Sequence, residues 1–146
     1  MKKRRLLLLL LSVLLLAGIL WLAFARPTVR VEKTIRTDGG ACWNVVAVAR
    51  SFRAFQTSPG SRSVEKWEDG EWKPCGFVPG EIGEMIQFHM ISLNIPGQKA
   101  VISKDIGSVY DLSSPGRYRV SVDIYPDGGE AFVIFREFTV RASDTN

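Results

Sequence analysis

The sequence is poor in the residues that most catalytic and metal sites use. Its 146 residues include two cysteines and one histidine, His89. No Cys-x-x-Cys pair is present, and no serine lies in a Gly-x-Ser-x-Gly motif. Zinc sites, histidine-based triads and serine hydrolases depend on such patterns. We therefore expect a protein that is not an enzyme and binds no metal or cofactor, with Glu81 and Glu84 as solvated loop charges.

Acidic residues are absent before Glu32, whereas Lys2, Lys3, Arg4 and Arg5 supply four of the 19 basic residues. Residues 26–146 carry 15 basic and 15 acidic side chains, so the net charge of +4 belongs to the N-terminus. Nucleic-acid binding requires clustered positive charge on the folded part of a protein. We therefore expect no nucleic-acid partner.

Charge is also absent from residues 6–25, and eleven of these twenty residues are leucine. A helix of this length spans about 30 Å, the thickness of a hydrocarbon core. The segment is thus either a retained single-pass anchor or a signal peptide cleaved near Ala25, after the small-x-small sequence of residues 23–25. Both alternatives place residues 26–146 outside the cytoplasm as one domain, with residues 1–25 as the signal anchor or signal peptide.

The two cysteines, Cys42 and Cys75, have two interpretations in an exported domain. An oxidising compartment favours a disulfide between them, and the loop that it closes predicts a stabilisation of about 3–4 kcal/mol. The alternative is a pair of buried free thiols.

No amphipathic helical pattern follows residue 26. Apolar and polar residues instead alternate, as in strands that bury one face. In 117–125 the residues expected to face the core are Tyr118, Val120, Val122 and Ile124; in 28–36 they are Val29, Val31 and Ile35. Further strands are predicted at 43–49, 62–75, 85–93, 99–103, 107–112 and 130–141. Seven or eight strands separated by turns predict an all-β, immunoglobulin-like β-sandwich behind the N-terminal helix.

A β-hairpin is predicted within residues 62–75. Asp69-Gly70 is the dipeptide preferred in a two-residue type I′ turn, in which both residues have positive φ. That turn pairs Trp67 with Trp72 as neighbours across the two strands. We expect Trp43 and Trp67 in the core, whereas Trp72 has two open interpretations, a core residue or part of a binding platform.

A tyrosine corner is predicted between Leu112 and Tyr118. A Pro-Gly turn that ends at Gly116 brings Tyr118 to the start of the penultimate strand. In immunoglobulin-like folds a tyrosine at this place bonds through its hydroxyl to the backbone a few residues upstream. The alternative is an ordinary turn followed by a core tyrosine.

Three segments together resemble the bacterial Ig-like domains of exported proteins. They are the hairpin sequence 64–72, residues 112–120 around the tyrosine corner, and the closing residues 135–140. The resemblance covers residues 30–142 and implies an Ig-like sandwich outside the cell membrane. It implies no catalytic residues, and Cys42 and Cys75 depart from its usual pattern.

The expected function is binding. The leading hypothesis is a non-enzymatic module that is tethered to the membrane through residues 6–25, or secreted, and that binds a protein or cell-envelope partner. The alternative is a secreted inhibitor or a binder of a small ligand or carbohydrate, acting through loops 76–84 and 94–99.

Overall fold

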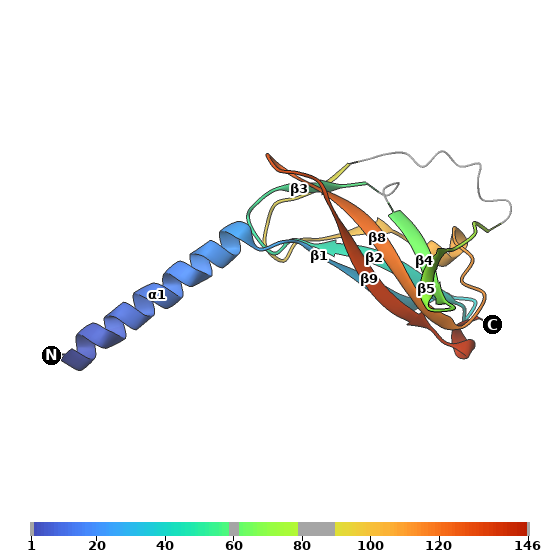
Figure 1. Cartoon of the computed structure of the whole chain (residues 1–146), viewed down its shortest axis with the longest axis horizontal. Coiled ribbons are helices and arrows are strands. Elements are labelled where there is room, and N and C mark those ends of the chain that lie inside the picture. The colour runs from blue at the N-terminus through green and yellow to red at the C-terminus, as the bar shows by residue number, and fades with distance from the viewer. Residues whose placement is uncertain (1, 59–61, 79–89, 146) are drawn as a thin grey trace.

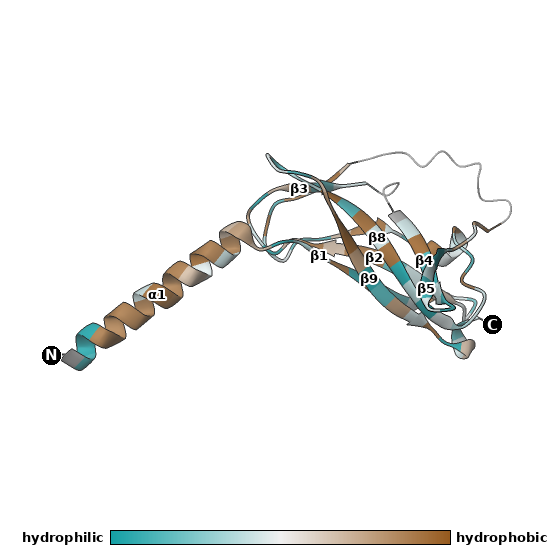
Figure 2. Cartoon of the chain, in the orientation of Figure 1, coloured by the Kyte–Doolittle hydropathy of each residue, from teal (hydrophilic) through white to brown (hydrophobic). Residues whose placement is uncertain are grey.

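The computed structural model describes residues 2–58, 62–78 and 90–145, and within them one long helix projects from two β-sheets (Figure 1). Helix α1 (Lys2–Phe24) is long and apolar enough to cross a membrane, and its apolar stretch is not buried against the rest of the protein. Figure 2 shows hydrophobic colouring along nearly its whole length. A helix that is apolar on all sides and unburied is the form that a bilayer accommodates.

The first sheet has three antiparallel strands in the order β1-β2-β7. Their bounds are Thr28–Ile35, Ala41–Val48 and Lys99–Ser103. Strand β2 is central, and its second half is buried on both faces. A short 3-10 helix, η1 (Ile106–Ser108), follows β7.

The second sheet is built around β8 (Gly116–Pro126). Strand β9 (Phe132–Val140) pairs along one edge of β8, while β3 (Phe55–Thr57) and β4 (Arg62–Glu68) pair with its two halves on the other edge. Strands β6 (Ile91–Leu93) and β5 (Glu71–Pro74) pair with β3 and β4, respectively. A second 3-10 helix, η2 (Ala142–Asp144), follows β9.

One hydrophobic core lies between the two sheets. Strand β8 contributes Tyr118, Val120, Val122 and Ile124, each fully buried, as the alternation predicts. Val45 and Ala47 of β2 belong to the same core from the opposite sheet. The structure therefore confirms a mostly β protein with two sheets behind an N-terminal apolar helix.

The strands differ from the sequence predictions in four respects. Ile35 is 74% exposed, because it lies at the last position of β1, opposite Ala41 at the beginning of β2. Residues 107–112 form no strand; η1 and an isolated bridge at Tyr110 occupy this region instead, and Ile106 is buried in the core. Strand β3 was not predicted at all. The described residues contain nine strands instead of seven or eight.

Part of one predicted strand lies outside the described residues. The 85–93 prediction is met by β6 over Ile91–Leu93, while 85–89 are not described. The same holds for His89, Glu81, Glu84 and most of loop 76–84.

Candidate functional site

The β4–β5 hairpin has the register that Asp69-Gly70 predicts. Trp67 pairs with Trp72, and Glu68 with Glu71. The φ angles are 54° at Asp69 and 85° at Gly70, both positive as a type I′ turn requires. The two indole rings lie edge to face, with centroids 5.1 Å apart. Such a packed aromatic pair stabilises the hairpin while its outer surface meets solvent.

Trp67 is not a core residue, in contrast to the sequence prediction. It is 38% exposed, whereas Trp43 is buried as expected. The reason is the phase of β4: Val64 points into the core, so Trp67, three positions further, points away from it. Lys66 takes the inward position near the strand end, and its ammonium lies 5.9 Å from the Tyr118 ring.

Around this hairpin, the outer side of the second sheet carries a cluster of rings and guanidinium groups. Cζ of Arg119 lies 4.6 Å from the ring centroid of Trp72 and 4.7 Å from that of Phe135. Cζ of Arg117 lies 5.7 Å from Trp67 and 5.9 Å from Trp72. We call these five residues, Trp67, Trp72, Arg117, Arg119 and Phe135, the aromatic–arginine face.

Strand pairing explains why the five residues meet. Register places Arg119 opposite Glu65 of β4 and Glu137 of β9, and Ser121 opposite Phe135. Residues opposite or diagonal to one another on one side of a sheet are close enough for long side chains to touch. Residues that are up to 68 positions apart in the sequence, from Trp67 to Phe135, thereby form one surface.

Two carboxylates neutralise the arginines of this face. Glu65 forms a salt bridge with Arg119 over 2.5 Å, and Glu137 forms one with Arg117 over 2.9 Å. The Arg119–Glu65 pair is about three-quarters buried, whereas the Arg117–Glu137 pair is more than half exposed. Together with these two carboxylates the face has no net charge, and its arginine side chains are held in place between rings and carboxylates.

This arrangement is suited to contact with another macromolecule. Tryptophan and arginine are the residues most enriched among those that dominate binding energy at protein interfaces. Phe135 is 54% exposed, so part of the face is apolar and open to solvent. Because Arg119 lies close to both Trp72 and Phe135, these rings are less open to stacking by a sugar, and the face is better suited to a protein surface.

The start of the strand that carries the two arginines has the hydrogen bond that the predicted tyrosine corner requires. The hydroxyl of Tyr118 donates a hydrogen bond of 2.6 Å to the backbone oxygen of Ser114, four residues upstream. Gly116 begins β8, and Leu112 is buried. Burial raises the pKa of Tyr118, so the hydroxyl stays protonated and continues to donate at neutral pH.

Of the two interpretations of the cysteines, the structure has the free thiols. Cys42 and Cys75 are both free and half-buried. Cys42 lies on β2 in the first sheet, while Cys75 follows β5 in the second. Desolvation, followed by the charge of Asp111, raises the pKa of Cys75 to about 11. A thiol with so high a pKa is a poor nucleophile at neutral pH.

Metal ligands do not gather in the part of the chain that the structure describes: no group of three or more His, Cys, Asp or Glu side chains is close enough to hold an ion there. Within the same residues, the candidate site therefore offers aromatic rings, guanidinium groups and paired carboxylates to a partner.

Of these residues, the sequence predicts a platform role only for Trp72, as one of its two interpretations, and not for Arg117, Arg119 or Phe135. The alternation in β8 and β9 already places all three on the solvent side, and the Asp127-Gly128 turn between these strands was the available signal for pairing them. No protein-family model matches this chain, and a comparison with curated proteins finds no match.

Proposed function

We propose that this protein is an exported, non-enzymatic binding module that α1 tethers to the membrane and that binds a protein partner through the aromatic–arginine face. The observation that carries the proposal is the close packing of two tryptophans, two arginines and a phenylalanine on an exposed, neutral sheet surface. These side chains are already ordered by their mutual contacts. Binding would therefore cost less conformational entropy than ordering free side chains.

The domain is proposed to be Ig-like, and the strand order supports this. An immunoglobulin-like fold has strands A, B and E adjacent in one sheet and C, F and G adjacent in the other. Here β1, β2 and β7 are adjacent in the same order as A, B and E, and β4, β8 and β9 in the same order as C, F and G. The hydrogen bond from the Tyr118 hydroxyl to the Ser114 backbone, at the start of β8, also supports this proposal, because a tyrosine corner lies at the start of strand F in such folds. The resemblance to bacterial Ig-like domains is part of the same proposal.

The tether is supported by how α1 joins the domain. Only residues 25–27 separate Phe24 from β1, and the backbone N–H of Phe52 donates to the carbonyl of Leu22 over 2.9 Å. The last turn of the helix is thus held by a loop of the domain. Cleavage after Ala25 would break this contact and release a secreted protein.

That release is the condition for the alternative function, a secreted inhibitor or small-ligand binder that acts through loops 76–84 and 94–99. The 94–99 turn is hydrogen-bonded to Ala49 and lies at the end of the domain that α1 joins (Figure 1). With α1 in a membrane, this turn would face the lipid and not a soluble target. Fractionation of cells with intact-mass measurement separates the two functions: a chain beginning at Arg26 in the medium would contradict the tether.

Binding at the face is tested with the tagged full chain in its native membranes. Proteins that copurify with the wild type are compared, by quantitative mass spectrometry after cross-linking, with those of a Trp72→Ala/Arg119→Ala variant. The matched control is Arg30→Ala/Val101→Ala, which removes an arginine and an exposed apolar side chain from the outer side of the first sheet.

The expected result is a partner that the wild type and the control retain and that the face variant loses by at least about tenfold, since hot-spot truncations cost about 2 kcal/mol or more. Thermal unfolding of all three proteins is measured to check that the domain stays folded. The proposal is wrong if the face variant and the control retain the same proteins in equal amounts.

A further inference from the structure

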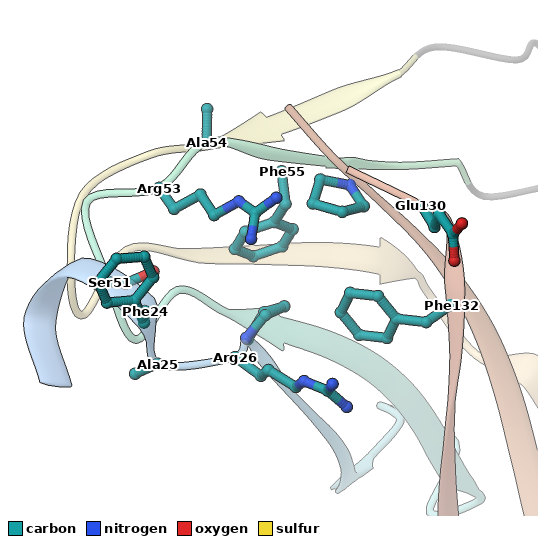
Figure 3. A pocket seen from close by; sticks show the side chains of 11 residues that line it. Phe24, Ala25, Arg26, Ser51, Arg53, Ala54, Phe55, Glu130 and Phe132 are labelled. Carbon is teal, nitrogen blue, oxygen red and sulfur yellow. The ribbon is translucent and has the colours of Figure 1, made fainter. Parts of the chain in front are cut away.

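A pocket lies where α1 meets the two-sheet domain, at the end of the domain opposite the β4–β5 hairpin tip (Figure 1), and Figure 3 shows its lining. Its volume is about 320 Å³. Four segments form it: the end of α1 with residues 25–27, the loop before β3 together with Phe55, Pro126 at the end of β8, and Glu130 with Phe132, the first residue of β9. We call it the junction pocket.

Two arginines line the junction pocket from different segments. Arg26 comes from the helix–strand linker and Arg53 from the loop before β3, and Figure 3 shows both side chains at the cavity. The guanidinium of Arg26 lies 5.3 Å from the ring centroid of Phe132. Neither arginine forms a salt bridge with a residue that the structure describes, and Glu130 is the one carboxylate in the pocket lining.

The position of Arg53 depends on a glycine. The Nη2 of Arg53 donates a hydrogen bond of 3.4 Å to the carbonyl of Asp127, which belongs to the β8–β9 turn. A Cβ atom on Gly129 would lie 2.5 Å from this nitrogen, closer than any real contact. The missing side chain thus makes room for the guanidinium beside the pocket.

The surroundings of the pocket are those of a membrane interface. Phe24, Phe52 and Ile95 are 70%, 64% and 59% exposed. The three residues 25–27 span at most about 11 Å when extended, so a membrane-spanning α1 keeps this end of the domain in or next to the headgroup layer. Exposed aromatic and basic side chains are typical of protein segments at that depth.

We infer that the junction pocket binds the phosphate of an anionic phospholipid headgroup, with Arg26 and Arg53 as its ligands. This inference rests on the tether in the proposed function, because α1 is what brings the pocket to the lipid. Guanidinium groups recognise phosphate oxygens through paired, charge-assisted hydrogen bonds. Phe52 and Ile95 enter the interfacial layer beside the bound headgroup.

The test is native mass spectrometry of the full chain, released from detergent micelles that contain equal amounts of phosphatidylglycerol and phosphatidylcholine. The wild type is expected to retain one phosphatidylglycerol in preference to phosphatidylcholine. An Arg26→Gln/Arg53→Gln variant is expected to retain at least about tenfold less phosphatidylglycerol than the wild type. The matched control, Lys73→Gln/Lys104→Gln, removes two positive charges at the far end of the domain and is expected to retain the lipid as the wild type does.

A second variant leaves the charge unchanged. Gly129→Ala displaces the flexible end of the Arg53 side chain from its position beside Gly129, so we expect weaker retention of phosphatidylglycerol, with thermal unfolding as the check that the domain stays folded. A further arm adds inorganic phosphate. Displacement of the lipid only far above equimolar phosphate supports a headgroup site, whereas displacement at equimolar phosphate overturns it in favour of a site for the free anion.

Equal retention of the two lipids by the wild type, or unchanged retention by Arg26→Gln/Arg53→Gln, also overturns the inference. Failure of the proposed function is seen separately. A chain beginning at Arg26 in the medium removes the tether, and equal retention of proteins by the Trp72→Ala/Arg119→Ala variant and its control removes the protein-binding face, which is a different surface.

Discussion

The two faces of β8 differ in what their side chains contact. Tyr118, Val120, Val122 and Ile124 are fully buried against the first sheet. Arg117 and Arg119, on the other face, contact rings and carboxylates of β4, β5 and β9. Because successive residues of a strand point to opposite sides, one strand holds the domain together and presents its candidate binding surface. Substitutions at neighbouring positions are therefore expected to change different properties.

The largest effect is expected from the inner face. Ile124→Ala removes three buried carbons from a fully buried position and is expected to lower the free energy of unfolding by about 2–5 kcal/mol. Its neighbour on the outer face supplies the control, since Asp123→Ala is expected to change this quantity by about 0.5 kcal/mol or less. Urea unfolding of the full chain in detergent, followed by tryptophan fluorescence, measures both. Equal losses in the two variants would contradict the division of β8 into two faces.

A smaller loss is expected at the start of the same strand. Tyr118→Phe keeps the ring in the core but removes the hydroxyl that donates to Ser114. The loss of one hydrogen bond to a partly buried carbonyl is expected to cost about 1–2 kcal/mol in the same unfolding experiment. A variant as stable as the wild type would show that the corner contributes only its ring.

The stability of the β4–β5 hairpin is expected to depend on the glycine in its turn. Gly70→Ala places a side chain at φ +85°, a conformation unfavourable for alanine, and is expected to cost about 1 kcal/mol and to separate the two indoles. Near-ultraviolet circular dichroism reports the indole pair. Gly76→Ala is the control, because its Cβ meets no atom within 4 Å and its φ is not in the left-handed region. The same spectral change in both variants would argue against strain at the turn.

No stability change is expected from reduction. Because Cys42 and Cys75 are free, dithiothreitol should leave the unfolding midpoint unchanged, whereas loss of a disulfide between them would cost about 3–4 kcal/mol. Alkylation gives a second measurement. With its pKa raised from 9.0 to about 11, Cys75 should react about a hundredfold more slowly at pH 8 than it does in the urea-unfolded chain. A midpoint that falls on reduction would show that the thiols are joined.

Local patterns predicted those parts of the fold that depend on neighbours in the sequence. The alternation in 117–125 identified the inner face of β8, and Asp69-Gly70 identified the Trp67–Trp72 pair. The same kind of pattern predicts Trp67 in the core and a strand at residues 107–112, and both predictions are wrong. Which side of β4 faces the core depends on how it pairs with β8, and this pairing joins residues more than 50 positions apart.

The candidate site was less predictable than the fold, because its residues meet only through tertiary pairing. Trp72, Arg119 and Phe135 lie on three strands, and each has an ordinary sequence environment. The junction pocket likewise combines Arg26 with Arg53 and Phe132, which no local motif links.

The sequence by itself determined that an apolar helix precedes a mostly β domain with no net charge, because length, hydropathy and side-chain alternation are properties of contiguous residues. The tertiary structure alone decided which side chains share a surface, since register and strand order bring distant residues within a few ångströms of one another. That is why the hairpin could be derived from two residues, whereas the aromatic–arginine face and the junction pocket required the folded chain.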